Sequence, residues 1–127
     1  MVNDIVADSL ARMNNGIQRG ADEIELLNSK MVLSIVEILK HEGFIDDFKV
    51  EGDTIIVNPT YNEAGDPVVR HFIKVSTPGQ RMYVSSKQII PIMNGRGISI
   101  ISTSDGLMTG AMAKSKGVGG EYICNIW

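Results

Sequence analysis

The apolar residues of this chain follow two different periods, and this pattern limits what the chain can fold into. From residue 4 to about residue 15, and again from 29 to 43, they recur at helical spacing. Gly16 can end the first helix, Asn28-Ser29 offers an N-cap for the second, and Gly43 can end it. Elsewhere the apolar runs are short and divided by glycine or proline, as in strands. No run approaches the roughly 20 residues of a membrane-spanning helix. The pattern predicts a mixture of helices and short strands.

The composition of the sequence changes after Pro78-Gly79, where glycine and hydroxyl residues become frequent. We therefore expect an α+β fold of two small packed lobes. The N-terminal α/β lobe, residues 1–77, should hold two helices, a short strand at 23–27 and a three-stranded meander at 44–51, 54–59 and 68–76. The C-terminal lobe, residues 78–127, should be mainly β, with strands at 81–84, 98–102 and 121–127 and short helices within 86–93 and 107–116.

Charge is distributed unequally along the chain, although the total is only −3. Residues 1–66 contain five Lys and Arg against 13 Asp and Glu, a balance of −8, whereas residues 67–127 contain seven against two, a balance of +5. A basic half suggests a partner with negative charge, most simply a nucleic acid. Two differently solvated faces would give the same numbers, so charge alone leaves both interpretations open.

Few side chains could support catalysis or hold a metal ion. The histidines are His41, at a predicted helix C-terminus, and His71, in a predicted strand, while the single cysteine, Cys124, has no second thiol to pair with. No phosphate-binding glycine motif occurs. We expect no enzyme activity, cofactor, metal or small-molecule substrate. The lone cysteine and an N-terminus unlike a signal peptide predict a cytoplasmic protein without a membrane segment.

The most specific pattern is the run from Gly97 to Thr109, where an apolar strand leads into three consecutive hydroxyl residues, Ser102, Thr103 and Ser104. Short hydroxyl side chains can donate to and accept from sugar, phosphate and base edges. The same run could instead form a capping turn, in which Ser104 or Asp105 satisfies exposed backbone amides.

Two other features of the C-terminal lobe suit the same kind of partner. Tyr83 lies close to Arg81 and Lys87, and an aromatic ring among cations is typical of sites that stack RNA bases. The glycine-rich segment 117–120 offers a backbone of little bulk, and Glu121 beside it can accept from a base or hold a neighbouring donor. A half-buried strand tyrosine and a tight turn are the simpler alternatives.

These residues resemble a known family. The run GISIISTSDGLMTGAMAK, from Gly97 to Lys114, is similar to the signature of the bacterial-type small ribosomal subunit protein eight. Segments at 4–15, 42–48, 78–83 and 119–124 resemble the same family, so the resemblance covers essentially the whole chain in order.

The resemblance implies a structural constituent of the ribosome without catalysis. Family members are primary rRNA-binding proteins that bind the central domain of 16S ribosomal RNA, chiefly an irregular stem with an internal loop, and help to assemble the platform of the 30S small subunit. The resemblance also implies contacts with small-subunit proteins five and twelve, a C-terminal RNA-binding lobe and a place in the cytoplasmic small subunit.

The resemblance further assigns RNA contacts by position. The hydroxyl triplet Ser102–Ser104 would meet the splayed bases and backbone of the RNA, with Tyr83 and Lys87 beside it and Gly120-Glu121 completing the surface. Arg12 and Asn15 of the first helix, with the loop residues Ser29 and Lys30, would contact another RNA segment. The chain departs from the family in its acidity and in Asp105, which stands where a basic residue is common. Fewer phosphate contacts predict a weaker salt dependence.

Two alternatives belong to other classes. A non-catalytic protein–protein interaction module would use the acidic lobe, but would not need a balance of +5 in the other lobe. A small enzyme would need a pocket that joins His71 or Cys124 to another titratable group.

Overall fold

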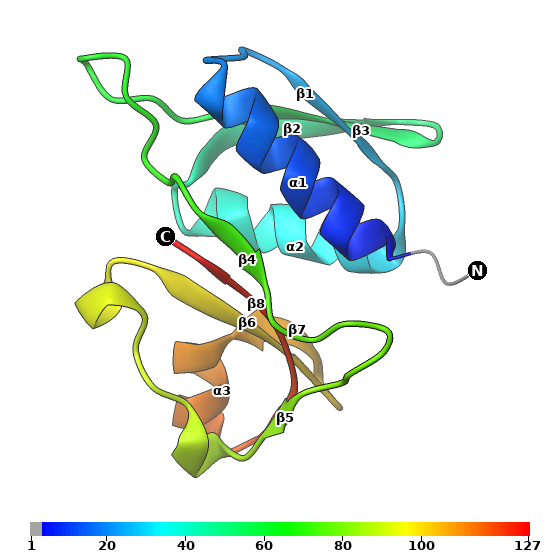
Figure 1. Ribbon diagram of the computed structural model, residues 1–127, viewed down its shortest axis with the longest axis vertical. Coiled ribbons are helices and arrows are strands. Elements are labelled where there is room, and N and C mark those ends of the chain that lie inside the picture. The colour runs from blue at the N-terminus through cyan, green and yellow to red at the C-terminus, as the bar shows by residue number, and fades with distance from the viewer. Residues whose placement is uncertain (1–3) are drawn as a thin grey trace. The chain divides into compact units, whose positions relative to one another are not determined.

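The computed structural model describes residues 4–127, which form two compact units (Figure 1). The N-terminal unit is Ile5–Arg70, and the C-terminal unit is His71–Trp127 together with Asp4. Each unit has its own antiparallel sheet and its own helices, so the predicted α+β fold is confirmed.

In the N-terminal unit two helices pack against a three-stranded sheet whose strand order is β1-β3-β2. All neighbours in this sheet are antiparallel. The elements are helix α1 (Ile5–Gln18), strand β1 (Ile24–Leu27), helix α2 (Lys30–His41), strand β2 (Ile45–Glu51) and strand β3 (Thr54–Pro59).

The helical spacing seen in the sequence forms the core of this unit. Each helix buries one apolar stripe, and β3 alternates between buried and half-buried positions, with Ile55 and Val57 fully buried. Such alternation is expected of a strand with one face against a core. The buried helix residues are Val6, Leu10, Met13 and Ile17 of α1 and Val32, Ile35, Val36 and Leu39 of α2.

Helix α1 continues to Gln18, past the end predicted at Gly16. Gly16 is buried, and a Cβ at this position would lie 2.6 Å from the side chain of Ile24 in β1. The glycine therefore allows the helix and the strand to approach closely and does not end the helix. The predicted cap of α2 is confirmed, because the Ser29 side chain accepts a hydrogen bond from the backbone of Val32.

The C-terminal unit is built on a five-stranded sheet of order β4-β8-β6-β7, in which β5 also pairs with β8. The last strand is thus paired with β6 along one edge and with β4 and β5 along the other (Figure 1). The strands are β4 (Phe72–Lys74), β5 (Tyr83–Val84), β6 (Ile98–Thr103), β7 (Gly106–Thr109) and β8 (Gly120–Ile126). The helix is α3 (Gly110–Lys116), and 3-10 turns lie at Ser86–Gln88 and Met93–Gly95.

One sequence prediction for these segments was wrong. The strand expected at 68–76 covers only Phe72–Lys74, and it pairs with β8 instead of closing the N-terminal meander. Residues 71–77, predicted in the first lobe, therefore lie in the C-terminal unit. The helical turns expected within 107–116 are present as α3, which begins at Gly110 because Leu107 and its neighbours form β7 opposite β6. Phe72 is buried beside Ile126, a partner too distant in sequence for local patterns to reveal.

Helix α3 covers one face of the C-terminal sheet. Its Ala113 is fully buried in a cluster with Ile101 of β6, Met108 of β7 and Ile89. Val84, Val118 and Tyr122 pack against this cluster from the rim.

Candidate nucleic-acid interface

Three strands of the C-terminal unit bring distant segments into one row of residues. Glu121 of β8 is paired with Tyr83 of β5 on one side and with Ser102 of β6 on the other. Residues directly opposite each other in antiparallel strands project their side chains on the same face. Tyr83, Glu121 and Ser102, which we call the cross-strand row, therefore share the face opposite the α3 cluster. The structure thus places together three of the residues predicted to bind RNA.

Tyr83 is the most exposed member of the cross-strand row. Its side chain is 68% exposed, so the alternative of a half-buried strand tyrosine is wrong. The strand already holds this aromatic ring at the surface. Stacking of a planar partner on the ring therefore costs little conformational entropy.

The hydroxyl triplet divides into residues with different surroundings. Thr103 ends β6, and its Oγ1 donates to the carbonyl of Gly106 over 2.9 Å and accepts from the backbone N–H of Asp105 over 3.1 Å. A capping turn is therefore present, but Thr103 forms it in place of Ser104 or Asp105, the residues expected to do so. Ser104 is exposed, and within residues 4–127 its hydroxyl makes no hydrogen bond, while Ser102 is half-buried. The side chain best placed to contact a ligand is that of Ser104.

The glycines before Glu121 allow close packing of the protein's own strands. A Cβ on Gly120 would lie 2.0 Å from the carbonyl oxygen of Ser102. A Cβ on Gly119 would lie 2.3 Å from the carbonyl oxygen of Val84. Glycine at these two positions lets β8 fit between β5 and β6, which brings the three residues of the cross-strand row together.

Glu121 holds neighbouring donors, one of the two roles open from the sequence. Its Oε2 accepts from the hydroxyl of Ser76 over 2.5 Å and from Nη1 of Arg81 over 3.2 Å. The Glu121 side chain is 20% exposed and that of Arg81 is 49% exposed. Sequence reasoning missed Ser76, since nothing local marks a serine as buried. Lys87 is exposed on the 3-10 turn that follows β5.

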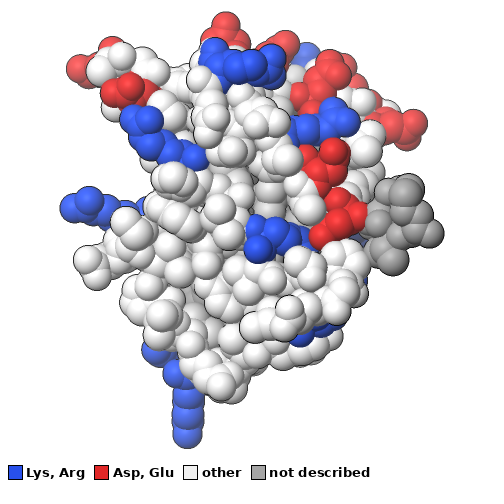
Figure 2. All heavy atoms as spheres, in the orientation of Figure 1, with Lys and Arg blue, Asp and Glu red and all other residues white. Residues whose placement is uncertain are grey.

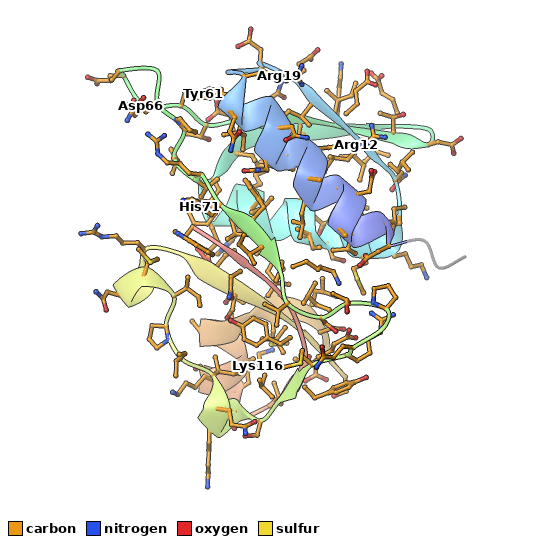
Figure 3. All side chains as sticks on the ribbon, viewed as in Figure 1. Arg12, Arg19, Tyr61, Asp66, His71 and Lys116 are labelled. Atoms are coloured by element: carbon orange, nitrogen blue, oxygen red, sulfur yellow. The ribbon has the colours of Figure 1, made fainter. Side chains whose placement is uncertain are left out.

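The other predicted contacts lie in the N-terminal unit. Arg12 and Asn15 are both exposed on α1, one turn apart, and Figure 3 shows Arg12 and Arg19 along this helix. The Nε of Arg12 pairs with Asp8 over 2.9 Å, with both side chains about half exposed. Such a pair contributes little to stability, so Arg12 can exchange this partner for a phosphate at small cost.

Ser29 and Lys30 lie at the start of α2. The hydroxyl of Ser29 accepts from the backbone N–H of Val32 over 3.2 Å, and Lys30 is exposed as the first residue of the helix. Ser29 therefore has a capping role independent of any ligand.

The charge asymmetry of the sequence follows the two units. The N-terminal unit has six Lys and Arg against 12 Asp and Glu, and the C-terminal unit has six against three. On the face drawn in Figure 2, most of the acidic side chains lie over the N-terminal unit. The C-terminal unit is therefore the electrostatically favourable one for a polyanion.

The two histidines, which were considered as possible catalytic groups, lie apart from the cross-strand row in sequence and have other neighbours. His41 is exposed in the last turn of α2, and the ring of His71 stacks on Trp127 with centroids 4.9 Å apart. Within residues 4–127, no group of His, Cys, Asp and Glu could hold a metal ion. No helix in this range is long and apolar enough to cross a membrane.

Cys124 is fully buried in β8, as expected for a packed structural thiol. Burial raises the pKa of Cys124 to about 12, and Lys74 offsets this only in part. Since the thiolate is the reactive form, the folded protein should resist iodoacetamide at pH 8, and labelling should become rapid in denaturant. Mass spectrometry of timed samples measures both rates. Labelling of the folded protein at the rate of an exposed thiol would contradict this prediction.

Comparison with known proteins identifies the family. The sequence model of Ribosomal protein S8 matches residues 4–127. Among similar proteins, each named small ribosomal subunit protein uS8, that of Mycoplasma capricolum is 43% identical over 130 residues, that of Oleidesulfovibrio alaskensis 42% over 127, and that of Thermodesulfovibrio yellowstonii 41% over 131. Each comparison covers the whole of both chains. The chain therefore belongs to the ribosomal protein S8 family.

Proposed function

We propose that this protein binds the central domain of 16S ribosomal RNA and helps to assemble the platform of the 30S subunit. As a member of its family it is a structural constituent of the small ribosomal subunit, which is cytoplasmic in bacteria. Ribosomal RNA and other small-subunit proteins are its partners in that particle. We assign the RNA contact to the C-terminal unit and assign no catalytic step to the protein.

The cross-strand row is the observation that carries this proposal. It combines an exposed aromatic ring at Tyr83, a carboxylate that holds Arg81, and a half-buried hydroxyl at Ser102 that leads into the exposed Ser104. Aromatic stacking on a base contributes about 1–3 kcal/mol, and it needs a base outside the double helix. Hydroxyl groups and a guanidinium suit the sugar, phosphate and base edges around such a base.

This combination favours an irregular stem over a regular duplex. In A-form RNA the base edges of the major groove lie too deep for side chains, whereas bases of an internal loop can leave the stack. We therefore infer that the target is a stem whose internal loop presents unpaired bases to Tyr83 and to the hairpin at Ser104. Arg12, Asn15, Ser29 and Lys30 are then available for a second RNA segment.

The test is the affinity of the purified protein for a short small-subunit RNA stem with and without its internal loop, at two salt concentrations. Tight binding that needs the loop supports the proposal. Weak binding that is the same for both RNAs contradicts it. Because 15 acidic residues offset 12 basic ones, the log–log salt slope should be shallower than that of a basic family member. An equally steep slope would contradict the idea of few phosphate contacts.

Lys87 should act as a phosphate contact, because its side chain is exposed on the 3-10 turn after β5 and lies outside the row itself. Lys87→Ala is expected to weaken binding to the intact and the disrupted stem by a similar factor, and to lower the salt slope by about one. Titrations of both RNAs at several salt concentrations measure this. A loss confined to the intact stem would make Lys87 a base-reading residue.

The acidic N-terminal unit supports a second role. With 12 acidic residues against six basic ones, it suits a basic protein neighbour better than a polyanion. Small-subunit proteins five and twelve are the partners we propose. Binding assays with each purified protein test this, and no detectable binding to either would remove the proposal.

A further inference from the structure

A buried serine joins the strands that carry the proposed RNA contacts. Ser76 is fully buried between β4 and β5. Its hydroxyl donates to Oε2 of Glu121 over 2.5 Å and accepts from the backbone N–H of Met82 over 3.2 Å. The hydroxyl group of Ser76 thus donates its proton to β8 and accepts the N–H that precedes β5, so it links both segments.

The loop between Ser76 and Met82 is held on β8 at both ends. At its start the N–H of Val75 donates to the carbonyl of Ile123, and at its end the N–H of Tyr122 donates to the carbonyl of Met82. The next element, β5, has two residues and pairs only through them. A strand this short gains little from its own ladder, so the side-chain link from Ser76 contributes to its placement.

The same link continues to Arg81. The oxygen of Glu121 that accepts from Ser76 also accepts from Nη1 of Arg81 over 3.2 Å. A half-exposed ion pair is worth little when both side chains are mobile. Here the buried hydroxyl fixes one partner in advance, which reduces the entropy that Arg81 must lose when it pairs. The guanidinium of Arg81 is thereby held at Glu121, the strand partner of Tyr83.

We propose that Ser76 is a positioning residue for RNA recognition, which fixes Glu121, and through it Arg81 and the strand that presents Tyr83. Ser76 is too deeply buried to reach an RNA. This inference rests on the proposed function, since it concerns the same surface. Alanine at this position keeps the backbone and nearly the volume of serine, but it can neither donate to Glu121 nor accept from Met82.

The experiment measures the ratio of affinities for the stem with and without its internal loop. Ser76→Ala should lower this ratio about tenfold, as expected for the loss of a hydrogen bond to a charged group. Destabilisation alone would reduce the active fraction for both RNAs equally and leave the ratio unchanged. Amide hydrogen exchange in the free protein should show faster exchange at Met82, which tests the contact without RNA.

Two further variants complete the test. Glu121→Ala, at a partly exposed position, probes the same contact from the other side, and adding Ser76→Ala to it should change the ratio by less than about twofold if both act as one unit. Ser99→Ala is the matched control, because Ser99 is a buried serine of β6 outside this network, and it should leave the ratio unchanged.

The outcomes separate the two proposals. A parent protein that does not distinguish the two RNAs overturns the proposed function and the role of Ser76 in it. A parent that distinguishes them while Ser76→Ala keeps the same ratio overturns only the positioning role. The same holds if the effects of Ser76→Ala and Glu121→Ala simply add. A reduced ratio with non-additive effects and faster exchange at Met82 supports the inference.

Discussion

Gly120→Ala is expected to destabilise the protein by about 3 kcal/mol, the upper part of the usual range for overpacking. The new Cβ would lie 2.0 Å from the carbonyl oxygen of Ser102. That atom belongs to the backbone of β6, so no flexible side chain can move aside, and β8 must separate from β6. For a chain of this length the midpoint of thermal unfolding should fall by roughly 10 °C. Calorimetry or circular dichroism measures the change.

Gly79→Ala is the matched control for this prediction. A Cβ on Gly79 would have no neighbouring atom within 4 Å. Its effect on stability should stay within about 0.5 kcal/mol. If both variants unfolded at the parent temperature, the close approach of β8 and β6 at Gly120 would be wrong. In the destabilised variant, RNA affinity measured well below its melting temperature should also fall, because Ser102 moves away from Glu121 and Tyr83.

Ser104→Ala is expected to weaken RNA binding by about 1–3 kcal/mol, which is fivefold or more in affinity, without changing stability. Ser104 is exposed at the tip of the β6–β7 hairpin, and its hydroxyl bonds to nothing within residues 4–127. Removing the hydroxyl therefore breaks no hydrogen bond of the folded protein. Any loss of affinity then measures a contact between this hydroxyl and the RNA. Titration with the intact stem, alongside a thermal melt, measures both quantities.

Two comparisons make the Ser104 result interpretable. Ser115→Ala removes another exposed hydroxyl, on α3 of the same unit, and should not affect binding. Thr103→Ala should weaken binding and also reduce stability by about 1 kcal/mol, because the Thr103 hydroxyl makes two bonds within the turn. Unchanged affinity in Ser104→Ala would remove Ser104 from the proposed RNA surface.

Sequence patterns predicted the helices and strands that are determined by residues close together in the chain. The helical stripe of α2 and its cap at Ser29 were both expected, because spacing and capping act within a few residues. The same reasoning failed for β4, whose place depends on pairing between Phe72 and Ile126 across most of the C-terminal unit. A short apolar segment carries no information about which distant strand it will join.

In the candidate site, too, the sequence predicted some features and not those that depend on distant contacts. Its prominent residues, Tyr83, Glu121 and the hydroxyl triplet, were predicted from their chemistry and from the family resemblance. The sequence did not separate the turn-forming role of Thr103 from the exposure of Ser104, and it did not reveal Ser76, whose importance lies in burial. The glycines were expected either in a tight turn or against a ligand, whereas Gly120 lies against the backbone of β6. Such contacts are properties of the assembled sheet.

Strand β8 lies at the C-terminal end of the chain, yet β4 and β5 pair with no other strand within residues 4–127. While the chain is being synthesised, these strands leave the exit tunnel before their partner has followed. The row of Tyr83, Glu121 and Ser102 can form only after β8 has been synthesised, because Glu121 of β8 pairs with both other residues. We therefore expect the proposed RNA surface to be complete only in chains whose synthesis has reached β8.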